Sequence, residues 1–420
     1  MTRARIGEAL RTRPGRVLAA AVVAGLVVAL VALVVVPGAT PPGGRHRPTG
    51  PDPDAGSSTG VTTEVASPPA AVPDTAVTVL PAPHPVAAPP PPAASRPTPT
   101  APATSTPAPS YPAPRPEANR SAPAPPPAPP PGAVTAGDFP DPAVLRVGAV
   151  YYAYSTEVGA TAVPVIRSVD LVRWESAGNA LANLPAWSGG ASVWAPSVVA
   201  TASGYVLFYS TRDNRTGDQC ISRAVSLLPE GPFVDTSANP FECQLGLGGS
   251  IDPDPFVDAN GAQWLMWKSQ GTASGTPPHI WAQAVGGDWK FLVGQPVALL
   301  TPDQSWEGGV VEAPAMFRAG SRYYLLYSGN SWNTAAYGVG YAVCRTVTGP
   351  CVKPRPGPAL ATHGNEAGPG SPAVFVDALG HTRVVFHAWA KPHVGYPGGE
   401  RSLHLGTVSV SGDALVISEP

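Results

Sequence analysis

Three acidic residues stand at the start of similar phrases in the C-terminal two thirds of the chain. They are Asp141 in Asp-Phe-Pro-Asp-Pro, Asp252 in Ile-Asp-Pro, and Glu312 in Val-Glu-Ala-Pro. A carboxylate pair can supply the general base and the general acid of a hydrolysis, while a third carboxylate tunes their pKa values. A single Asp before Pro is commonly a turn residue, so it is the recurrence at the starts of phrases that favours this chemistry.

The third phrase holds a second candidate, because Asp254 follows Asp252 by two residues and also precedes a proline. The repeat pattern alone allows either residue to be the functional one. The two remaining phrases carry Ala195 and Ser371 at this place.

Five copies of the phrase predict the elements that position these residues. Each copy is an apolar run, a turn containing Gly, and an aromatic-rich run, which is typical of the first hairpin of a four-stranded blade. Successive prolines are separated by 54, 59, 59 and 58 residues: Pro142, Pro196, Pro255, Pro314 and Pro372. Such a period indicates a repeat architecture. We therefore expect an all-β, five-bladed β-propeller over residues 134–420, with the starts of the phrases facing one central channel.

Composition excludes several classes of function. The net charge of −2 and the 13% of charged residues argue against a nucleic-acid-binding surface. The sequence contains no GxGxxG before a helix, no P-loop, no HExxH and no GxSxG, which removes the common nucleotide, zinc-peptidase and serine-hydrolase signatures.

The N-terminus predicts export. Residues 1–16 hold five arginines and one glutamate, and an uncharged apolar run follows from Val17 to Val36. Twenty residues of helix match the thickness of a bilayer, and the preceding positive charge predicts a cytoplasmic N-terminus. Residues 1–39 are thus a signal peptide cleaved near Ala39 or an uncleaved anchor that crosses the membrane through 17–36. Either reading places the rest of the chain outside the cytoplasm.

Residues 40–133 form a second region, dominated by Pro, Ala, Ser and Thr. This composition cannot bury enough apolar surface to offset the entropy of ordering, so we expect a disordered linker. Its proline runs favour extended polyproline II, which suits a spacer between the apolar segment and the folded unit.

The chain has four cysteines, all in the repeat region. An even number in an exported chain favours disulfides. We expect neighbours in the sequence to pair, Cys220 with Cys243 and Cys344 with Cys351, each pair closing a loop within one blade.

Residues 138–410 resemble glycoside hydrolase family 43, a family of five-bladed propellers that act on arabinose- and xylose-containing glycans. The matching segments span the whole predicted propeller: Asp138-Phe-Pro-Asp141-Pro-Ala-Val-Leu, Val193-Trp-Ala-Pro196, Ser250-Ile-Asp252-Pro, Trp306-Glu-Gly-Gly-Val-Val-Glu312-Ala-Pro, and Gly368-Pro-Gly370 followed by Phe386-His387-Ala.

The resemblance implies a role for each acid. The general base of the family falls on Asp141, the general acid on Glu312, and the residue that modulates the pKa of the acid on Asp252, which the Ile-Asp-Pro pattern selects over Asp254. Hydrolysis would then proceed in a single displacement with inversion, in which Asp141 activates water and Glu312 protonates the leaving oxygen.

Aromatic rings near the phrases are candidate platforms for sugar rings: Phe139, Trp194, Trp306 and Trp332. The alternative for each Trp is the core between blades. Arg401 matches a C-terminal arginine that reaches the sugar in the family, and a surface salt bridge is its alternative role.

The chain departs from the family pattern at two positions. Many family members carry a His in the fifth blade that helps hold a calcium ion in the channel, but Ser371 stands there in this chain. A hydroxyl is a weaker ligand for an ion, so we expect no required cofactor and a structural role for His387. In the second blade, Ser197 stands where family members often have Asp.

The function this resemblance implies is an exported glycosidase, and specifically an exo-acting α-L-arabinofuranosidase. Its partners would be arabinan, arabinoxylan or xylan oligosaccharides, and the chain would act as a monomer. A β-xylosidase and an endo-arabinanase remain open, as does a propeller that binds sugars without turning them over.

Overall fold

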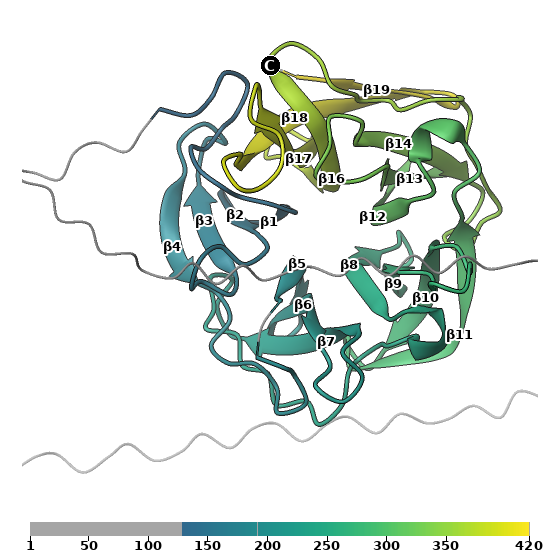
Figure 1. Cartoon of the computed structure of the whole chain (residues 1–420). Helices are drawn as coiled ribbons and strands as arrows, with labels where there is room; N and C mark the ends of the chain where they lie inside the picture. Colours follow the sequence, from purple (N-terminus) through teal and green to yellow (C-terminus); the bar gives the residue numbers. More distant parts are fainter. Residues whose placement is uncertain (1–127, 191, 420) are drawn as a thin grey trace, which may run out of the picture. The chain divides into compact units, whose positions relative to one another are not determined.

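The computed structural model describes residues 128–190 and 192–419, and it confirms an all-β propeller of five blades (Figure 1). The predicted apolar helix and nearly all of the predicted linker lie outside the described residues. Within these residues, no helix has the length and apolar character needed to cross a membrane.

Each blade is an antiparallel meander. The first contains β1 (Ala143–Val147), β2 (Val150–Tyr154), β3 (Pro164–Ser168) and β4 (Glu175–Asn179). The second contains β5 (Trp194–Thr201), β6 (Gly204–Arg212) and β7 (Gln219–Ser226). The third contains β8 (Ser250–Val257), β9 (Gln263–Ser269), β10 (His279–Gly286) and β11 (Phe291–Leu300).

The fourth blade contains β12 (Val311–Ala319), β13 (Arg322–Gly329), β14 (Gly338–Cys344) and β15 (Cys351–Val352). The fifth contains β16 (Glu366–Val376), β17 (Thr382–Ala390), β18 (Arg401–Ser411) and β19 (Ala414–Ser418). Two short 3₁₀ helices, η1 (Leu245–Leu247) and η2 (Ser305–Glu307), precede β8 and β12. The strands β1, β5, β8, β12 and β16 lie innermost around the centre (Figure 1).

The inner strands share one backbone distortion. The residue before the first proline of each phrase has a positive φ, between 44° and 56°: Asp141, Ala195, Asp252, Ala313 and Ser371. A non-glycine residue in this region is costly, of order 1–3 kcal/mol each. In blades two to five a shift in strand register accompanies the distortion.

This distortion corrects the alignment of the phrases that we inferred from sequence. The structural equivalent of Pro142 in the third blade is Pro253 rather than Pro255, because Asp252 has the positive φ. In the fourth blade the equivalent of Asp141 is Ala313. Glu312 therefore stands one residue earlier than the other two acids, and the three do not occupy one repeated position.

The N–H group of each distorted residue donates a hydrogen bond to a side chain of the preceding blade. The acceptors are Thr156 for Ala195, Ser210 for Asp252, Ser328 for Ser371, and His387 for Asp141, at 2.8–3.2 Å. Strand register puts these four acceptors at one repeated position, and Lys268 occupies it in the third blade. Because Lys has no acceptor, the N–H of Ala313 donates to Asp252 instead, at 2.9 Å.

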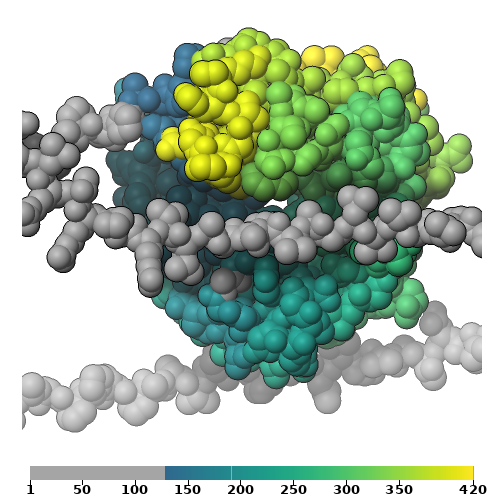
Figure 2. Space-filling view, viewed as in Figure 1, coloured from purple at the N-terminus to yellow at the C-terminus, as the bar shows by residue number. Residues whose placement is uncertain are grey.

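The blades pack through apolar faces, and the two ends of the described chain meet. One core cluster joins Tyr324 and Leu326 of the fourth blade to Phe386 and Val384 of the fifth. Ala133 pairs with His404 of β18, so the segment before β1 attaches to the fifth blade. Figure 2 shows the blue N-terminal and yellow C-terminal residues side by side. This pairing closes the ring.

Two disulfides lie within blades, and they join the neighbours named above. Cys220 of β7 pairs with Cys243, and Cys344 of β14 pairs with Cys351 of β15. The β14–β15 ladder sets Cys344 directly opposite Cys351, which brings their sulfur atoms together.

Candidate active site

A cavity of about 610 Å³ opens at the centre of the propeller, and residues from all five blades line it. Asp141, Asp252 and Glu312 are among these residues, so the fold brings together all three acids singled out in the sequence. Its volume falls in the range of roughly 300–1,000 Å³ that is usual for small-molecule sites.

Asp141 sits in a positive environment. Its Oδ2 accepts a hydrogen bond from the Thr156 hydroxyl at 2.6 Å, and Nη1 of Arg401 lies 3.3 Å from Oδ1. Burial by itself would raise the pKa of Asp141, but Arg401 and the hydrogen bonds outweigh it and hold the pKa below the ordinary value of 3.8. Asp141 is therefore ionised at neutral pH and able to accept a proton.

His387 also contacts Asp141, but it carries no charge. Its Nδ1 accepts the N–H of Asp141 at 3.1 Å and lies 3.4 Å from Oδ1. Burial lowers the pKa of His387 to about 3, so the ring is neutral and its contact with Asp141 is not an ion pair. Because Nδ1 is an acceptor, the proton of the neutral ring is on Nε2.

Asp252 and Glu312 form the opposite side of the cavity. Burial raises the pKa of Asp252 to about 7, and the charge of Glu312 adds to the rise. Two interacting carboxylates titrate as a unit. The pair therefore holds one proton up to near-neutral pH, and that proton is available to a bound leaving group.

Lys268 and Tyr337 hold Glu312 in place. Nζ of Lys268 donates to Oε2 of Glu312 at 2.7 Å, and the Tyr337 hydroxyl donates to Oε1 at 2.7 Å. The Lys268 side chain is only 8% exposed. Burial disfavours its charge, but Glu312 and Asp252 raise the pKa of Lys268 above the usual 10.5. The Asp252–Glu312 pair thus lies beside a permanent cation, the ammonium group of Lys268.

Asp254 lies outside the large cavity. Its Oδ2 accepts the N–H of Met316 on the neighbouring blade at 2.9 Å. Burial raises the pKa of Asp254 to about 7. Its contacts make it a tie between blades, whereas Asp252 faces Glu312.

Arg401 lies among aromatic rings at the rim of the cavity. Its guanidinium carbon is 4.6 Å from the ring centre of Trp332, 5.6 Å from Tyr396 and 5.8 Å from Trp389. Trp194, Trp332 and Arg401 all line the cavity. These three are placed where a bound sugar could contact them, and Trp332 is 39% exposed.

Phe139 and Trp306, which we listed as candidate sugar platforms, do not line the cavity. Phe139 is buried in the core between the first and fifth blades. Trp306 packs against the core of blades three and four, with its indole N–H donating to Gln304 at 2.6 Å. Glycines at 329 and 340 leave room for its ring. Both rings serve packing.

Lys268, Tyr337, Thr156 and His387 are site residues to which sequence reasoning gave no catalytic role. Aligning the second strands of the repeats would have shown Lys268 as the basic exception at a position held otherwise by Ser, Thr and His. Tyr337 lies outside the repeated phrases, and no sequence signal marks it.

The channel is a poor match for the calcium ion that the resemblance suggests. Ser371 donates its N–H to Ser328, and Nδ1 of His387 is already an acceptor for backbone. Calcium takes six to eight oxygen ligands, whereas these residues offer a hydroxyl and an imidazole.

A five-bladed propeller whose central cavity opposes an ionised Asp to a protonated carboxylate pair is the arrangement of a glycosidase. The sequence model of Glycosyl hydrolases family 43 matches residues 131–414, and the chain belongs to this family.

Known relatives agree with this assignment. Arabinan endo-1,5-alpha-L-arabinosidase C of Emericella nidulans is 29% identical over 282 residues, covering 60% of this chain and 82% of the relative. The Xylosidase/arabinosidase of Butyrivibrio fibrisolvens is 26% identical over 211 residues, covering 46% of this chain but only 38% of the relative. The crystal structure of a thermostable family-43 glycoside hydrolase is 30% identical, with a TM-score of 0.61 over 67% of this chain and 93% of that one.

Proposed function

We propose that the chain hydrolyses glycosidic bonds of arabinose- or xylose-containing polysaccharides with inversion. Asp141 is the general base and takes a proton from the attacking water. Glu312 is the general acid and gives a proton to the leaving oxygen. Asp252 shares that proton with Glu312 and keeps it available near neutral pH. Inversion requires the two carboxyl groups to stand roughly 6.5–9.5 Å apart, so that water fits beside the sugar.

The observation that carries the proposal is the opposite electrostatic setting of the acids. Arg401 helps hold the pKa of Asp141 below 3.8, whereas burial and Glu312 raise the pKa of Asp252 to about 7. Carboxyl groups whose environments separate their pKa values are the mark of an acid and a base in one site. A protein that only binds sugar has no need of this separation.

The substrate we favour is a terminal α-L-arabinofuranosyl unit. The Asp-Phe-Pro-Asp-Pro opening, the Trp-Glu-Gly stretch before Glu312 and Ser371 in the fifth blade favour exo action. The names of the relatives support arabinan and xylosides as alternatives, since one acts as an endo-arabinosidase and another as a xylosidase/arabinosidase. A β-xylosidase is thus the second candidate.

We also propose that the enzyme works outside the cytoplasm as a monomer and needs no metal for turnover. Export is supported by the arginine-rich start and the apolar run after it, and by two disulfides. Independence from metal is supported by Ser371 at the position where family members carry an ion-holding His.

The test is hydrolysis of aryl α-L-arabinofuranoside and aryl β-D-xyloside, with linear arabinan as a third substrate and Asp141→Asn as the control variant. Turnover of one aryl glycoside that disappears in the variant identifies the glycone. NMR of the first-formed sugar shows whether the anomeric configuration inverts. Binding of arabinan or xylan without turnover of any substrate would replace this proposal with a sugar-binding propeller.

A further inference from the structure

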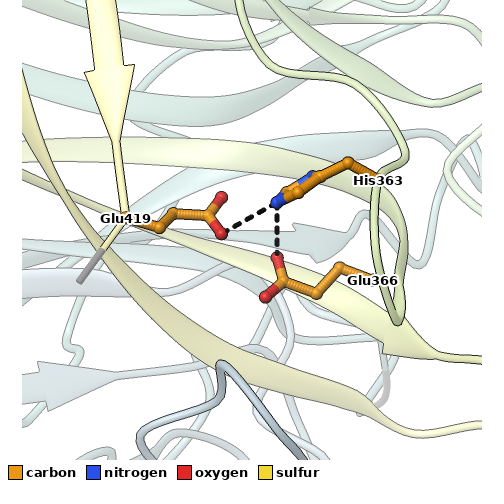
Figure 3. A group of neighbouring side chains, drawn as sticks. All are labelled: His363, Glu366 and Glu419. Carbon is orange, nitrogen blue, oxygen red and sulfur yellow. Dashed lines mark hydrogen bonds and ion pairs between the residues drawn. The ribbon is translucent and has the colours of Figure 1, made fainter.

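A second group of titratable side chains meets at the outer part of the fifth blade, and none of them lines the cavity (Figure 3). His363 lies in the turn before β16, Glu366 is the first residue of β16, and Glu419 follows β19. Nε2 of His363 lies 3.0 Å from Oε2 of Glu419 and 4.0 Å from Oε2 of Glu366. Three segments thus direct donor atoms at one point.

Part of this cluster is buried without partners. The side chain of Glu366 is 9% exposed, and its Oε2 has no hydrogen-bond partner among the described residues. The same holds for Oε1 of Glu419. Buried polar atoms in folded proteins are nearly always hydrogen-bonded or bound to an ion. These two oxygens, next to the imidazole nitrogen of His363, form a set of donor atoms that a cation could join.

The tautomer of His363 is set by its second nitrogen. Nδ1 lies 3.0 Å from the carbonyl oxygen of Ala361, which only accepts, so Nδ1 carries a proton. Nε2 faces carboxylate oxygens, which also only accept, so without an ion it donates a proton to Glu419. An ion bound at this point would replace that proton. Histidine ligands of metals commonly donate their other N–H to a backbone carbonyl in this way.

Glu366 is held from its other side by His404. Nδ1 of the buried His404 lies 3.2 Å from Oε1 of Glu366, and its ring stacks on Phe386. Oε1 thus lies against His404, and Oε2 is directed at His363. Oriented carboxylates of this kind are typical of metal sites with ordered surroundings.

We propose that His363, Glu366 and Glu419 bind a divalent zinc-class ion, with His404 as the positioning residue for Glu366. An imidazole with two carboxylates suits zinc, whereas calcium prefers an all-oxygen set. With bonds of about 2.0 Å, tetrahedral zinc places its ligand atoms about 3.3 Å apart. The observed separations of 3.0 and 4.0 Å lie on either side of that value. A water molecule would complete the four ligands.

The position of the site gives the ion a structural role. It would tie the residue after the last strand of the fifth blade to the start of its first strand. The attachment point of the N-terminal segment is adjacent, since Ala133 pairs with His404 and Gly132 packs on Glu366. The ion would thus fasten the place where the two ends of the propeller meet.

The experiment uses the full chain, purified without a histidine tag and treated with a chelator that is then removed. We expect titration with Zn²⁺ to show one ion per chain and to raise the unfolding temperature, while kcat/KM on the aryl substrate stays unchanged. In His363→Ala and in the isosteric Glu419→Gln, Zn²⁺ affinity should fall at least about tenfold.

His381→Ala is the matched control. His381 is an exposed histidine of the same blade that contacts Asp377 and lies outside the cluster. The His381→Ala variant should bind Zn²⁺ as the unaltered chain does. Failure to bind Zn²⁺ in a one-to-one ratio, or equal binding by Glu419→Gln, would show that the cluster is an ion-pair network only. Neither outcome bears on the proposed hydrolysis.

Discussion

Two blade junctions that face each other across the cavity are built on one backbone pattern and differ in charge. Where the fifth blade meets the first, neutral His387 accepts the N–H of Asp141. Where the third meets the fourth, Lys268 stands at the position of His387, and Asp252 accepts the N–H of Ala313 in its place.

This difference between His387 and Lys268 explains how one repeated element can produce both an acid and a base. The imidazole of His387 ties the fifth blade to the first and leaves the carboxylate of Asp141 beside Arg401. A lysine cannot accept the bond, so a carboxylate is drawn into the junction beside Glu312. The same fold element thus produces an ionised base on one side and a protonated pair on the other.

Removing either reacting carboxylate should give the largest effect. Asp141→Asn and Glu312→Gln should each lower kcat/KM by about 10²–10⁴-fold, the usual contribution of a general acid or base. Circular dichroism should show the fold unchanged. A substrate with a dinitrophenyl leaving group, which needs no proton from the enzyme, distinguishes loss of the general acid from loss of the general base. It should restore much of the activity of Glu312→Gln and none of that of Asp141→Asn, and equal restoration in both would contradict the assigned roles.

The second prediction concerns Lys268, the cation at the junction of the third and fourth blades. Lys268→Met removes a charge that favours the ionised form of the Asp252–Glu312 pair, so the pair should hold its proton to higher pH. The basic limb of the kcat/KM profile, expected near pH 7 in the unaltered chain, should move up by about 1–3 pH units. A uniform loss of activity with an unmoved limb would mean that Lys268 serves packing alone.

The third prediction is the counterpart at the other junction. Arg401→Gln removes the cation that lowers the pKa of Asp141. The acid limb of the profile, which lies below pH 3.8 in the unaltered chain, should move upward by about one unit. The basic limb should stay in place. Movement of both limbs together would argue against separate control of the two sides.

The smallest effect on activity is expected at Asp254. Asp254→Asn retains an acceptor for the N–H of Met316 and should change kcat/KM by less than about twofold, the scale of a residue that contacts no reacting group. Asp252→Asn is the comparison and should be strongly impaired.

The stability of the Asp254 variant should depend on pH. The pKa of Asp254 is raised to about 7 in the folded state, so between pH 4 and 7 the folded chain binds more protons than the unfolded chain at this site. Its contribution to stability is lost as pH rises through 7. Thermal unfolding should therefore show that Asp254→Asn gains stability over the unaltered chain at pH 8 relative to pH 5.

The number of blades could be predicted from the amino-acid sequence, because a period of nearly sixty residues with an apolar and an aromatic run in each unit has few other solutions. The sequence also identified Asp141, Asp252 and Glu312 as the acids that meet. The number of blades depends on residue types that recur, and the choice of Asp252 over Asp254 depends on the resemblance to the family.

The distribution of side chains between cavity and core could not be predicted in this way, because it depends on the folded backbone. Strand side chains alternate with a period of two, and the distortion before each proline interrupts that alternation. Glu312 therefore lines the cavity although Ala313 is the structural equivalent of Asp141. Phe139 is buried in the core, whereas Trp332 is open to the cavity. Lys268 faces Glu312, and His363 meets Glu419, through contacts between segments 44 and 56 residues apart. Distances of that kind are set by the packing of blades, which no local pattern encodes.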